Sequence, residues 1–113
     1  MHTVVESIKE LWNVMSIKSK EVQENFIENN NYYEAEWLNN WITDNRLESL
    51  IEYVETNLPN IDEKGVAKLQ KRIGKYINYF NILEKDDNKY EYMFNYLTDI
   101  PCQIVHYITN YNN

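Results

Sequence analysis

Glycine and proline are scarce in this chain, which has only two of each among 113 residues. Tight turns depend on these residues, because glycine adopts backbone angles closed to other residues and proline presets one of them. β-Sandwiches and barrels need many such turns, so an all-β fold is disfavoured. We therefore expect few, long secondary-structure elements within one domain covering residues 1–113.

Apolar residues recur at helical spacing through nearly the whole sequence. The clearest run extends from Val66 to Leu83, where apolar positions alternate steps of three and four. Apolar residues make up 43% of the chain, which is enough for one hydrophobic core without cross-links. The sequence predicts an all-α fold, a small antiparallel helical bundle or short helical stack of about five to six helices.

Capping residues mark the boundaries of the first predicted helix. Thr3 and Glu6 have the spacing of a capping box, which predicts a helix start at Val4. The apolar pattern weakens at residues 16–19, so one long helix and two shorter ones are both open. The asparagines at 29–31 predict the end of this segment, because asparagine prefers turns and caps over helix interiors.

Three further signals of helix boundaries or packing lie in the middle of the chain. Asp44 is predicted to be the N-cap of a new helix. Asn60 with Glu63 has the spacing of a second capping box, which predicts another helix start. Gly74 either lets a neighbouring helix approach closely or is neutral.

The C-terminal part is predicted to contain two short helices. Residues 90–97 have helical periodicity, and Asp99 and Pro101 fit the N-cap and an early position of a following helix. Residues 104–111 also alternate well enough to pass for a strand. We favour helix, because a lone strand has no partner for its backbone hydrogen bonds.

Acidic side chains are concentrated in one block. Between Glu21 and Glu55 the chain carries nine carboxylates and one base, Arg46, and the net charge of the whole chain is −7. Direct binding of nucleic acid is disfavoured, because phosphate contacts need a positive surface. On an ideal helix, part of the block forms an acidic ridge beside the apolar stripe. This ridge consists of Asp44, Glu48, Glu52 and Glu55.

A basic ridge on the following helix leaves three interpretations of the acidic ridge open. The two ridges pair inside the molecule, or the acids form an ordinary solvated face, or they dock a basic partner. Internal pairing is geometrically awkward, because the basic ridge lies nearly opposite the apolar stripe of its own helix. The basic ridge consists of Lys64, Lys68, Lys71 and Lys75.

Aromatic residues inside the acidic block are candidate anchors for a partner. Trp37 and Trp41 are four positions apart and are expected mainly in the core. Tyr32 and Tyr33 lie beside the asparagine run and are expected to be exposed. The residues predicted to bind a partner are Tyr32, Tyr33, Glu34, Glu36, Asp44, Glu48, Glu52 and Glu55.

No residue pattern predicts catalysis, a metal site or a cofactor. Cys102 and His106 are four positions apart, but two ligands do not make a metal site, and no second observation supports a nucleophile and base. Two isolated glycines exclude a glycine-rich phosphate loop. We expect a protein that is not an enzyme.

The cellular compartment and the source organism are inferred from sequence features that are missing and from the amino-acid composition. A single cysteine fits a reducing compartment, and we identify neither a signal peptide nor a membrane span. A cytoplasmic protein without membrane contacts is expected. Residues with A/T-rich codons are abundant, which indicates an AT-rich genome or a mobile accessory gene of a bacterium or phage.

These observations favour a small protein inhibitor. The leading hypothesis is a bacterial immunity protein that neutralises a basic toxin, most naturally a nuclease, by occluding its active site or substrate groove. A phage antagonist of a host nucleic-acid-binding complex, similar in role to an anti-CRISPR protein, is an alternative with the same electrostatics. A helical structural or assembly subunit is a third.

Overall fold

The computed structural model describes residues 3–111, and this part of the chain is helical with no β-strand. The all-α prediction is confirmed, and residues 104–110 belong to a helix. The helices are α1 (Val4–Glu28), α2 (Tyr32–Thr43), α3 (Arg46–Asn57), α4 (Glu63–Leu83) and α5 (Lys89–Asn110), with a 3-10 turn at Leu58–Asn60.

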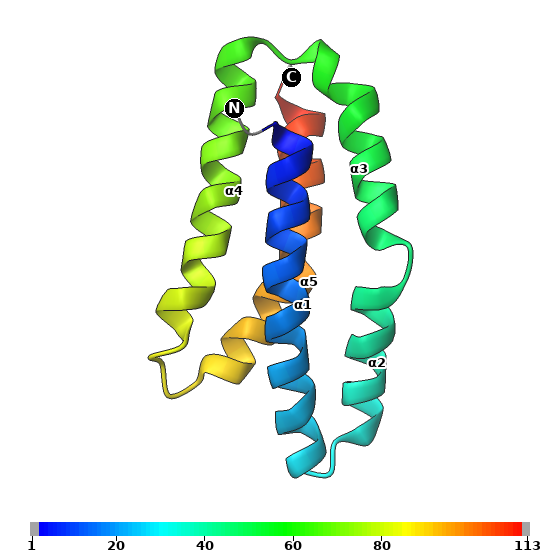
Figure 1. The fold of residues 1–113 in the computed structure, drawn as a ribbon, viewed down its shortest axis with the longest axis vertical. Helices are drawn as coiled ribbons and strands as arrows, with labels where there is room; N and C mark the ends of the chain where they lie inside the picture. The colour runs from blue at the N-terminus through cyan, green and yellow to red at the C-terminus, as the bar shows by residue number, and fades with distance from the viewer. Residues whose placement is uncertain (1–2, 112–113) are drawn as a thin grey trace.

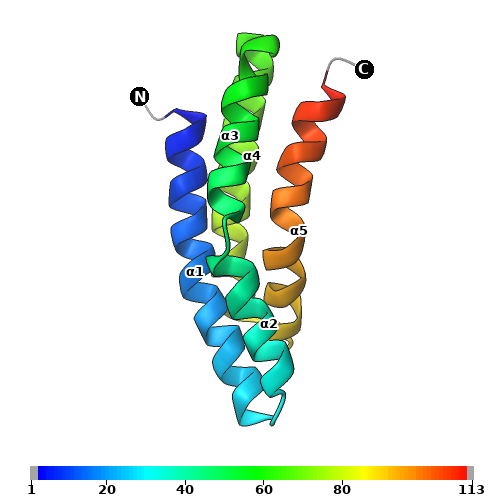
Figure 2. The same cartoon turned by 90° about the vertical axis from the view of Figure 1, so that its right-hand side faces the viewer.

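The helices form an antiparallel bundle of four rods, measuring 47 × 28 × 27 Å (Figure 1). α2 and α3 follow one another along a single side of the bundle and make one interrupted rod, so the predicted count of five to six helices is slightly too high. An even number of rods returns the chain to its starting end, so α1 begins and α5 finishes at the same end of the bundle, on opposite sides of it (Figure 2). At the other end, the hairpin of α1 and α2 extends beyond the α4–α5 corner (Figures 1 and 2).

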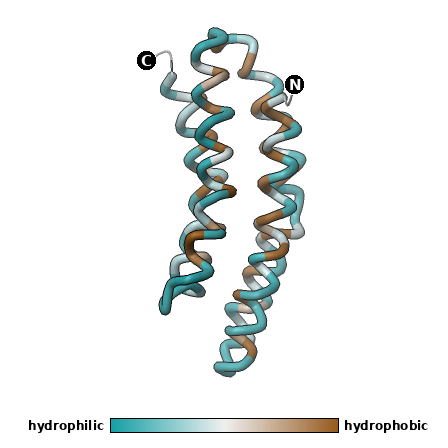
Figure 3. Tube along the Cα trace, turned by 60° about the vertical axis from the view of Figure 1, so that its left-hand side comes forward, coloured by the Kyte–Doolittle hydropathy of each residue, from teal (hydrophilic) through white to brown (hydrophobic). Residues whose placement is uncertain are grey.

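α1 is the central element and packs against all four other helices. The α2–α3 rod and α4 lie on opposite flanks of the α1–α5 pair (Figure 1). Apolar positions recur at helical intervals along the chain (Figure 3), and the largest of them meet in one core. Its fully buried members include Ile8, Leu11, Met15, Leu38, Leu69, Ile73, Phe80, Met93, Leu97 and Ile104.

α1 is one continuous helix that begins and ends where the sequence predicts. The Thr3 hydroxyl accepts a hydrogen bond from the backbone N–H of Glu6 at 3.1 Å, so the predicted cap is confirmed. At the C-terminal end Asn30 adopts a positive φ of 63°. The N–H groups of Asn30 and Asn31 donate to the carbonyls of Ile27 and Phe26, which is the Schellman arrangement that satisfies the last carbonyls of a helix.

The break between α2 and α3 is held by aromatic and cationic contacts. The rings of Trp12 and Trp41 stack with centroids 6.1 Å apart, and the Trp12 indole donates to the carbonyl of Ile42 at 3.4 Å. Arg46 donates to the carbonyl of Trp41 at 3.0 Å and places its guanidinium 4.7 Å from the Trp41 ring centroid. A cation at the C-terminal end of α2 complements the helix dipole.

Three predicted N-caps are wrong, and one of them, Asp99, lies inside α5. Asp44 terminates α2, and its carboxylate accepts from the adjacent Asn45 N–H rather than from the first turn of α3. The N-cap of α4 is Asp62, which accepts from the Gly65 N–H at 2.8 Å. Asn60 belongs to the preceding 3-10 turn, because the chain continues in a helical sense after Pro59 before it straightens at residue 61.

The C-terminal segment is one helix rather than the predicted two. Pro101 lies inside α5, where it removes one backbone hydrogen bond. The helix runs obliquely at its start and upright towards its end (Figure 1). Burial on both sides of the proline keeps the helix continuous, since Leu97, Ile100, Ile104 and Ile108 form one buried stripe.

Gly65, and not Gly74, is the glycine that permits close helix packing. A Cβ atom on Gly65 would lie 2.2 Å from the Tyr111 ring, whereas a Cβ on Gly74 would meet no atom within 4 Å. The Tyr107 hydroxyl donates to the Gly65 carbonyl, and the Tyr111 hydroxyl donates to Asp62, both at 2.8 Å. These contacts fasten the end of α5 to the start of α4.

Candidate protein-binding surface

Three members of the predicted acidic ridge meet at one hollow. Glu48, Glu52 and Glu55 of α3 line a depression of about 630 Å³ between α3 and α1. Its apolar lining comes from two partly buried α3 residues that also pack on the core. The hollow is lined by Lys9, Leu47, Glu48, Ile51, Glu52, Glu55 and Thr56.

Asp44 does not join this group. It lies at the break before α3 and lines a different hollow, between α3 and α5, together with Pro101 and Cys102. The predicted ridge gave Asp44 the position it would have on an ideal helix with Glu48, but Asp44 lies in the break before α3.

The acids of α3 form no ion pair with any residue between 3 and 111. The ion pairs in this part of the chain involve Lys18, Glu21, Glu84 and Lys89. The predicted basic ridge of Lys64, Lys68, Lys71 and Lys75 is exposed on α4, across the α1–α5 pair from α3 (Figure 1). The two ridges therefore do not neutralise each other, and the internal-pairing interpretation does not describe this fold.

The tip of the α1–α2 hairpin carries the remaining predicted residues. Tyr32 and Tyr33 are 60% and 77% exposed, and Glu34 and Glu36 are exposed beside them. The tyrosine exposures agree with the sequence-based expectation. The tip thus presents aromatic rings and carboxylates together.

Trp37 departs from its expected place in the core. Trp41 is buried, but Trp37 is 41% exposed, because the first half of α2 extends beyond the α4–α5 corner and α5 covers only part of it. Its ring packs against Phe94 of α5 with centroids 5.8 Å apart. A hollow of about 210 Å³ opens beside these rings and is lined by Tyr33, Glu34, Trp37 and Phe94.

Phe94 was not predicted as part of a surface. It comes from α5, far from α2 in sequence, and only the fold brings the two together. The signal available in the sequence was the spacing of Tyr33 and Trp37, which places two aromatic side chains on one helical face.

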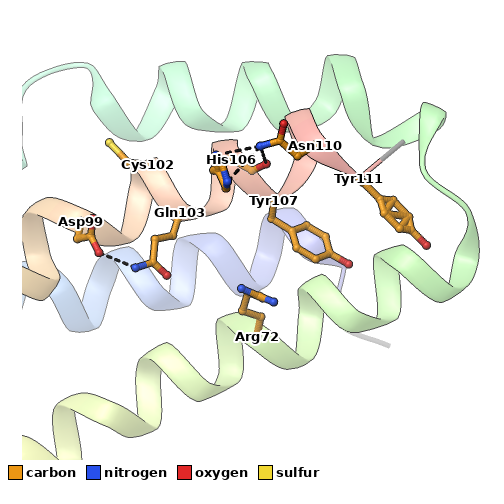
Figure 4. Close-up of a pocket in the computed structure, with 8 residues that line it drawn as sticks. All are labelled: Arg72, Asp99, Cys102, Gln103, His106, Tyr107, Asn110 and Tyr111. Carbon is orange, nitrogen blue, oxygen red and sulfur yellow. Dashed lines mark hydrogen bonds between the residues drawn. The ribbon is translucent and has the colours of Figure 1, made fainter. Parts of the chain in front are cut away.

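Another open groove, of about 680 Å³, lies between α4 and α5 (Figure 4). The Arg72 guanidinium lies 5.0 Å from the Tyr107 ring centroid on its wall. The hydroxyl of Tyr76 donates to the side-chain oxygen of Gln103 at 3.2 Å, and the Gln103 amide donates to Asp99. Its polar groups are therefore largely paired with one another.

Cys102 and His106 line this groove but are not bonded to each other in the described chain. The side-chain amide of Asn110 lies 2.9 Å from Nδ1 of His106. No group of three or more histidine, cysteine or acidic side chains is placed to hold a metal ion among residues 3–111. The groove offers no observed pairing of a nucleophile with a base.

An ion-pair cluster connects α1 to the α4–α5 corner. The Lys18 ammonium lies 2.5 Å from Glu84 and 3.7 Å from Glu21, and Lys89 lies 3.5 Å from Glu84. The hydrogen bond from Lys18 lowers the pKa of Glu84, whereas burial and the neighbouring Glu84 raise the pKa of Glu21. Of Glu84 and Glu21, Glu84 is the one whose charged form is stabilised by its surroundings.

Within the described residues, no helix combines the length and apolar character needed to cross a membrane. Comparison with models of protein families, with curated proteins and with solved structures finds no match for this chain.

Proposed function

We propose that this chain is a small protein inhibitor that binds a basic protein through its α3 hollow and its α1–α2 tip. The finer form of the proposal is an immunity protein that neutralises a nuclease toxin. The observation that supports it is that Glu48, Glu52 and Glu55 line one hollow with two apolar residues and a single base, Lys9, and form no ion pair with residues 3–111.

The spacing of these acids fits an external partner better than it fits the stability of α3. Glu48 and Glu52 are one turn apart, and like charges at this spacing destabilise a helix by about 0.2–0.5 kcal/mol. Bound lysine or arginine side chains would relieve this repulsion. Complementary charge would also accelerate the encounter with a partner and reject acidic proteins.

Inhibition follows from where a nuclease carries its positive charge. A groove that binds nucleic acid is lined by lysine and arginine, because phosphates dominate the affinity. The carboxylates of α3 can take the place of phosphates in such a groove, while the apolar lining of the hollow and the aromatic tip supply buried contacts. The inhibitor then needs no catalytic group of its own.

The proposal is tested by parallel capture from host extracts with three tagged proteins. These are the wild-type chain, a Glu48→Gln/Glu52→Gln/Glu55→Gln variant, and a matched Lys64→Gln/Lys68→Gln/Lys71→Gln variant. A basic protein should be captured by the wild type and the lysine variant, and weakly by the glutamate variant. Its association rate with the glutamate variant should fall about 10-fold or more at low salt.

Ionic strength provides the decisive measurement with the captured protein once it is purified. The association rate of the wild type should decrease steeply as salt is raised, and that of the glutamate variant should decrease less. A rate that is equal for both and indifferent to salt contradicts the electrostatic mechanism. A stable homo-oligomer that ignores salt, with no captured basic protein, would instead favour a helical assembly subunit.

A further inference from the structure

We infer that the hollow lined by Tyr33, Glu34, Trp37 and Phe94 binds the guanidinium group of an arginine side chain. The inference rests on the proposed function in one respect, namely that the arginine belongs to the basic partner. It assigns to this hollow a contact between a guanidinium and aromatic rings, which surface charge alone does not predict.

Two of the three aromatic rings that line the hollow, those of Trp37 and Phe94, are held by packing. Tyr33 and Trp37 are one turn apart on α2 and share a face. The ring of Trp37 meets that of Phe94 at 5.8 Å with an interplanar angle of 52°, and Phe26 of α1 packs edge-on against Phe94 at 5.6 Å and 82°. Three helices therefore hold the rings of Trp37 and Phe94, and a ligand does not have to order these two.

The hollow combines the two features that a guanidinium recognises. A cation within about 6 Å of an aromatic ring is attracted by the negative face of the ring. Glu34, at the same rim, is a carboxylate that accepts hydrogen bonds from a guanidinium at its edge. Arginine fits both features because it is planar, weakly hydrated and able to stack while donating in its own plane.

No cation of the described chain occupies this position. α2 contains no lysine or arginine, and Arg46, the only base between Glu21 and Glu55, is engaged at Trp41. Lys89, near the start of α5, lies over Tyr90 and beside Glu84. Within residues 3–111 Glu34 forms no ion pair. Charge complementarity therefore points to a cation from outside.

Size favours a single side chain over a metabolite. The hollow measures about 210 Å³, and pockets for small molecules typically measure about 300–1,000 Å³. Tyr33 is 77% exposed, so the hollow is open on the side from which a partner would approach.

The test uses the full-length chain labelled with ¹⁵N and two short peptides. The probe is acetyl-Gly-Arg-Gly-amide, and its matched control replaces arginine with citrulline, which has nearly the same shape and no charge. Titration with the arginine peptide should shift the indole N–H resonance of Trp37 in a saturable way, and the citrulline peptide should not. Tyr33→Leu and Glu34→Gln should each weaken binding about 3- to 30-fold.

Tyr92→Leu provides the control variant, because Tyr92 is an exposed aromatic residue of α5 outside the hollow. Peptide binding should be unchanged in it. Equal shifts with citrulline, or full binding by Tyr33→Leu, would overturn the inference. Tighter binding of tetramethylammonium chloride than of the arginine peptide would also overturn it, since the hollow would then suit a round cation.

The outcome separates this inference from the proposed function. If the arginine peptide fails to bind while the basic partner still associates in a salt-dependent way, the guanidinium site alone is wrong. If the peptide binds at Trp37 and no basic protein is captured, the proposed function fails and the cation site stands.

Discussion

The two ends of this bundle are finished in different ways. The closed end is the one where α4 begins and α5 finishes. There Gly65 lets the two helices touch, and the hydroxyls of Tyr107 and Tyr111 donate hydrogen bonds to the start of α4 and its N-cap. At the opposite end, the open end, the α1–α2 tip extends beyond the α4–α5 corner (Figure 1). Tyr33 and Trp37 of α2 are exposed. Aromatic side chains are thus packed against the protein at the closed end and exposed to solvent at the open end.

This difference shows which part of the surface the fold itself explains. Aromatic rings at the closed end have their hydroxyls bonded to the protein, so packing accounts for them. The tip instead exposes large rings among carboxylates, and grouped exposed apolar surface marks interaction sites in monomeric proteins. The tip is therefore where the proposed partner would add contacts that the described chain does not make by itself.

The largest expected effect concerns the closed end. Gly65→Ala should lower the free energy of unfolding by about 1–3 kcal/mol, because its Cβ would overlap the ring of Tyr111 and the side chain of Ile61. Gly74→Ala is the matched control in the same helix. It should raise stability by up to about 1 kcal/mol, since alanine favours helix and the site is open. Urea denaturation followed by circular dichroism measures both, and equal changes would contradict the close packing at Gly65.

An intermediate effect is expected where the tip joins the rest of the bundle. Glu84 has a lowered pKa in the folded state, so it stabilises the fold above the ordinary glutamate pKa, and this contribution is lost as the pH falls through the folded value. Glu84→Gln should lower stability at pH 7 by about 0.5–1 kcal/mol. The difference from wild type should shrink as the pH falls below the ordinary glutamate pKa, and it should vanish below the lowered folded pKa, where the carboxylate is neutral in both states.

Glu21→Gln is the control for this prediction. The pKa of Glu21 is raised in the folded state, so its charged form disfavours folding at neutral pH. Its substitution should leave stability at pH 7 unchanged or slightly higher. The free energy of unfolding of each variant is measured from pH 3 to pH 7. If Glu21→Gln lowered it as much as Glu84→Gln, the conclusion that only the charge of Glu84 stabilises the fold would be refuted.

The smallest expected effect on stability concerns the open end. Tyr33→Ser should change the free energy of unfolding by no more than about 0.5 kcal/mol, because a largely exposed side chain loses few contacts. The same denaturation assay measures it. A loss comparable to that of Gly65→Ala would mean that the tip is held together by its own tyrosine, which would erase the contrast between the two ends.

Local signals in the sequence predicted much of the fold. Thr3 capped α1, and the asparagine run ended it, because both act through hydrogen bonds within a few residues. Tyr32 and Tyr33 were placed at the surface by their position beside that run. The helical apolar stripes predicted an all-α core.

The wrong predictions share a physical cause. At each of these positions the local sequence allows more than one structure, and contacts with residues far away in the sequence determine which one forms. Pro101 has the signature of a helix start, but the buried stripe on both sides carries α5 through it. Gly65 and Gly74 are equivalent by sequence, and only the docking of Tyr111 distinguishes them. Trp37 has the periodicity of a core residue, but the unequal reach of the helices leaves it half exposed.

The return of the fourth rod to the starting end has a practical consequence for anyone who immobilises or labels this molecule. An affinity tag, a fluorophore or a fused reporter attached near either Val4 or Asn110 emerges from the same pole. The pole that bears Tyr33 and Trp37 is at the far end of the 47 Å long axis and stays unobstructed whichever terminus is used.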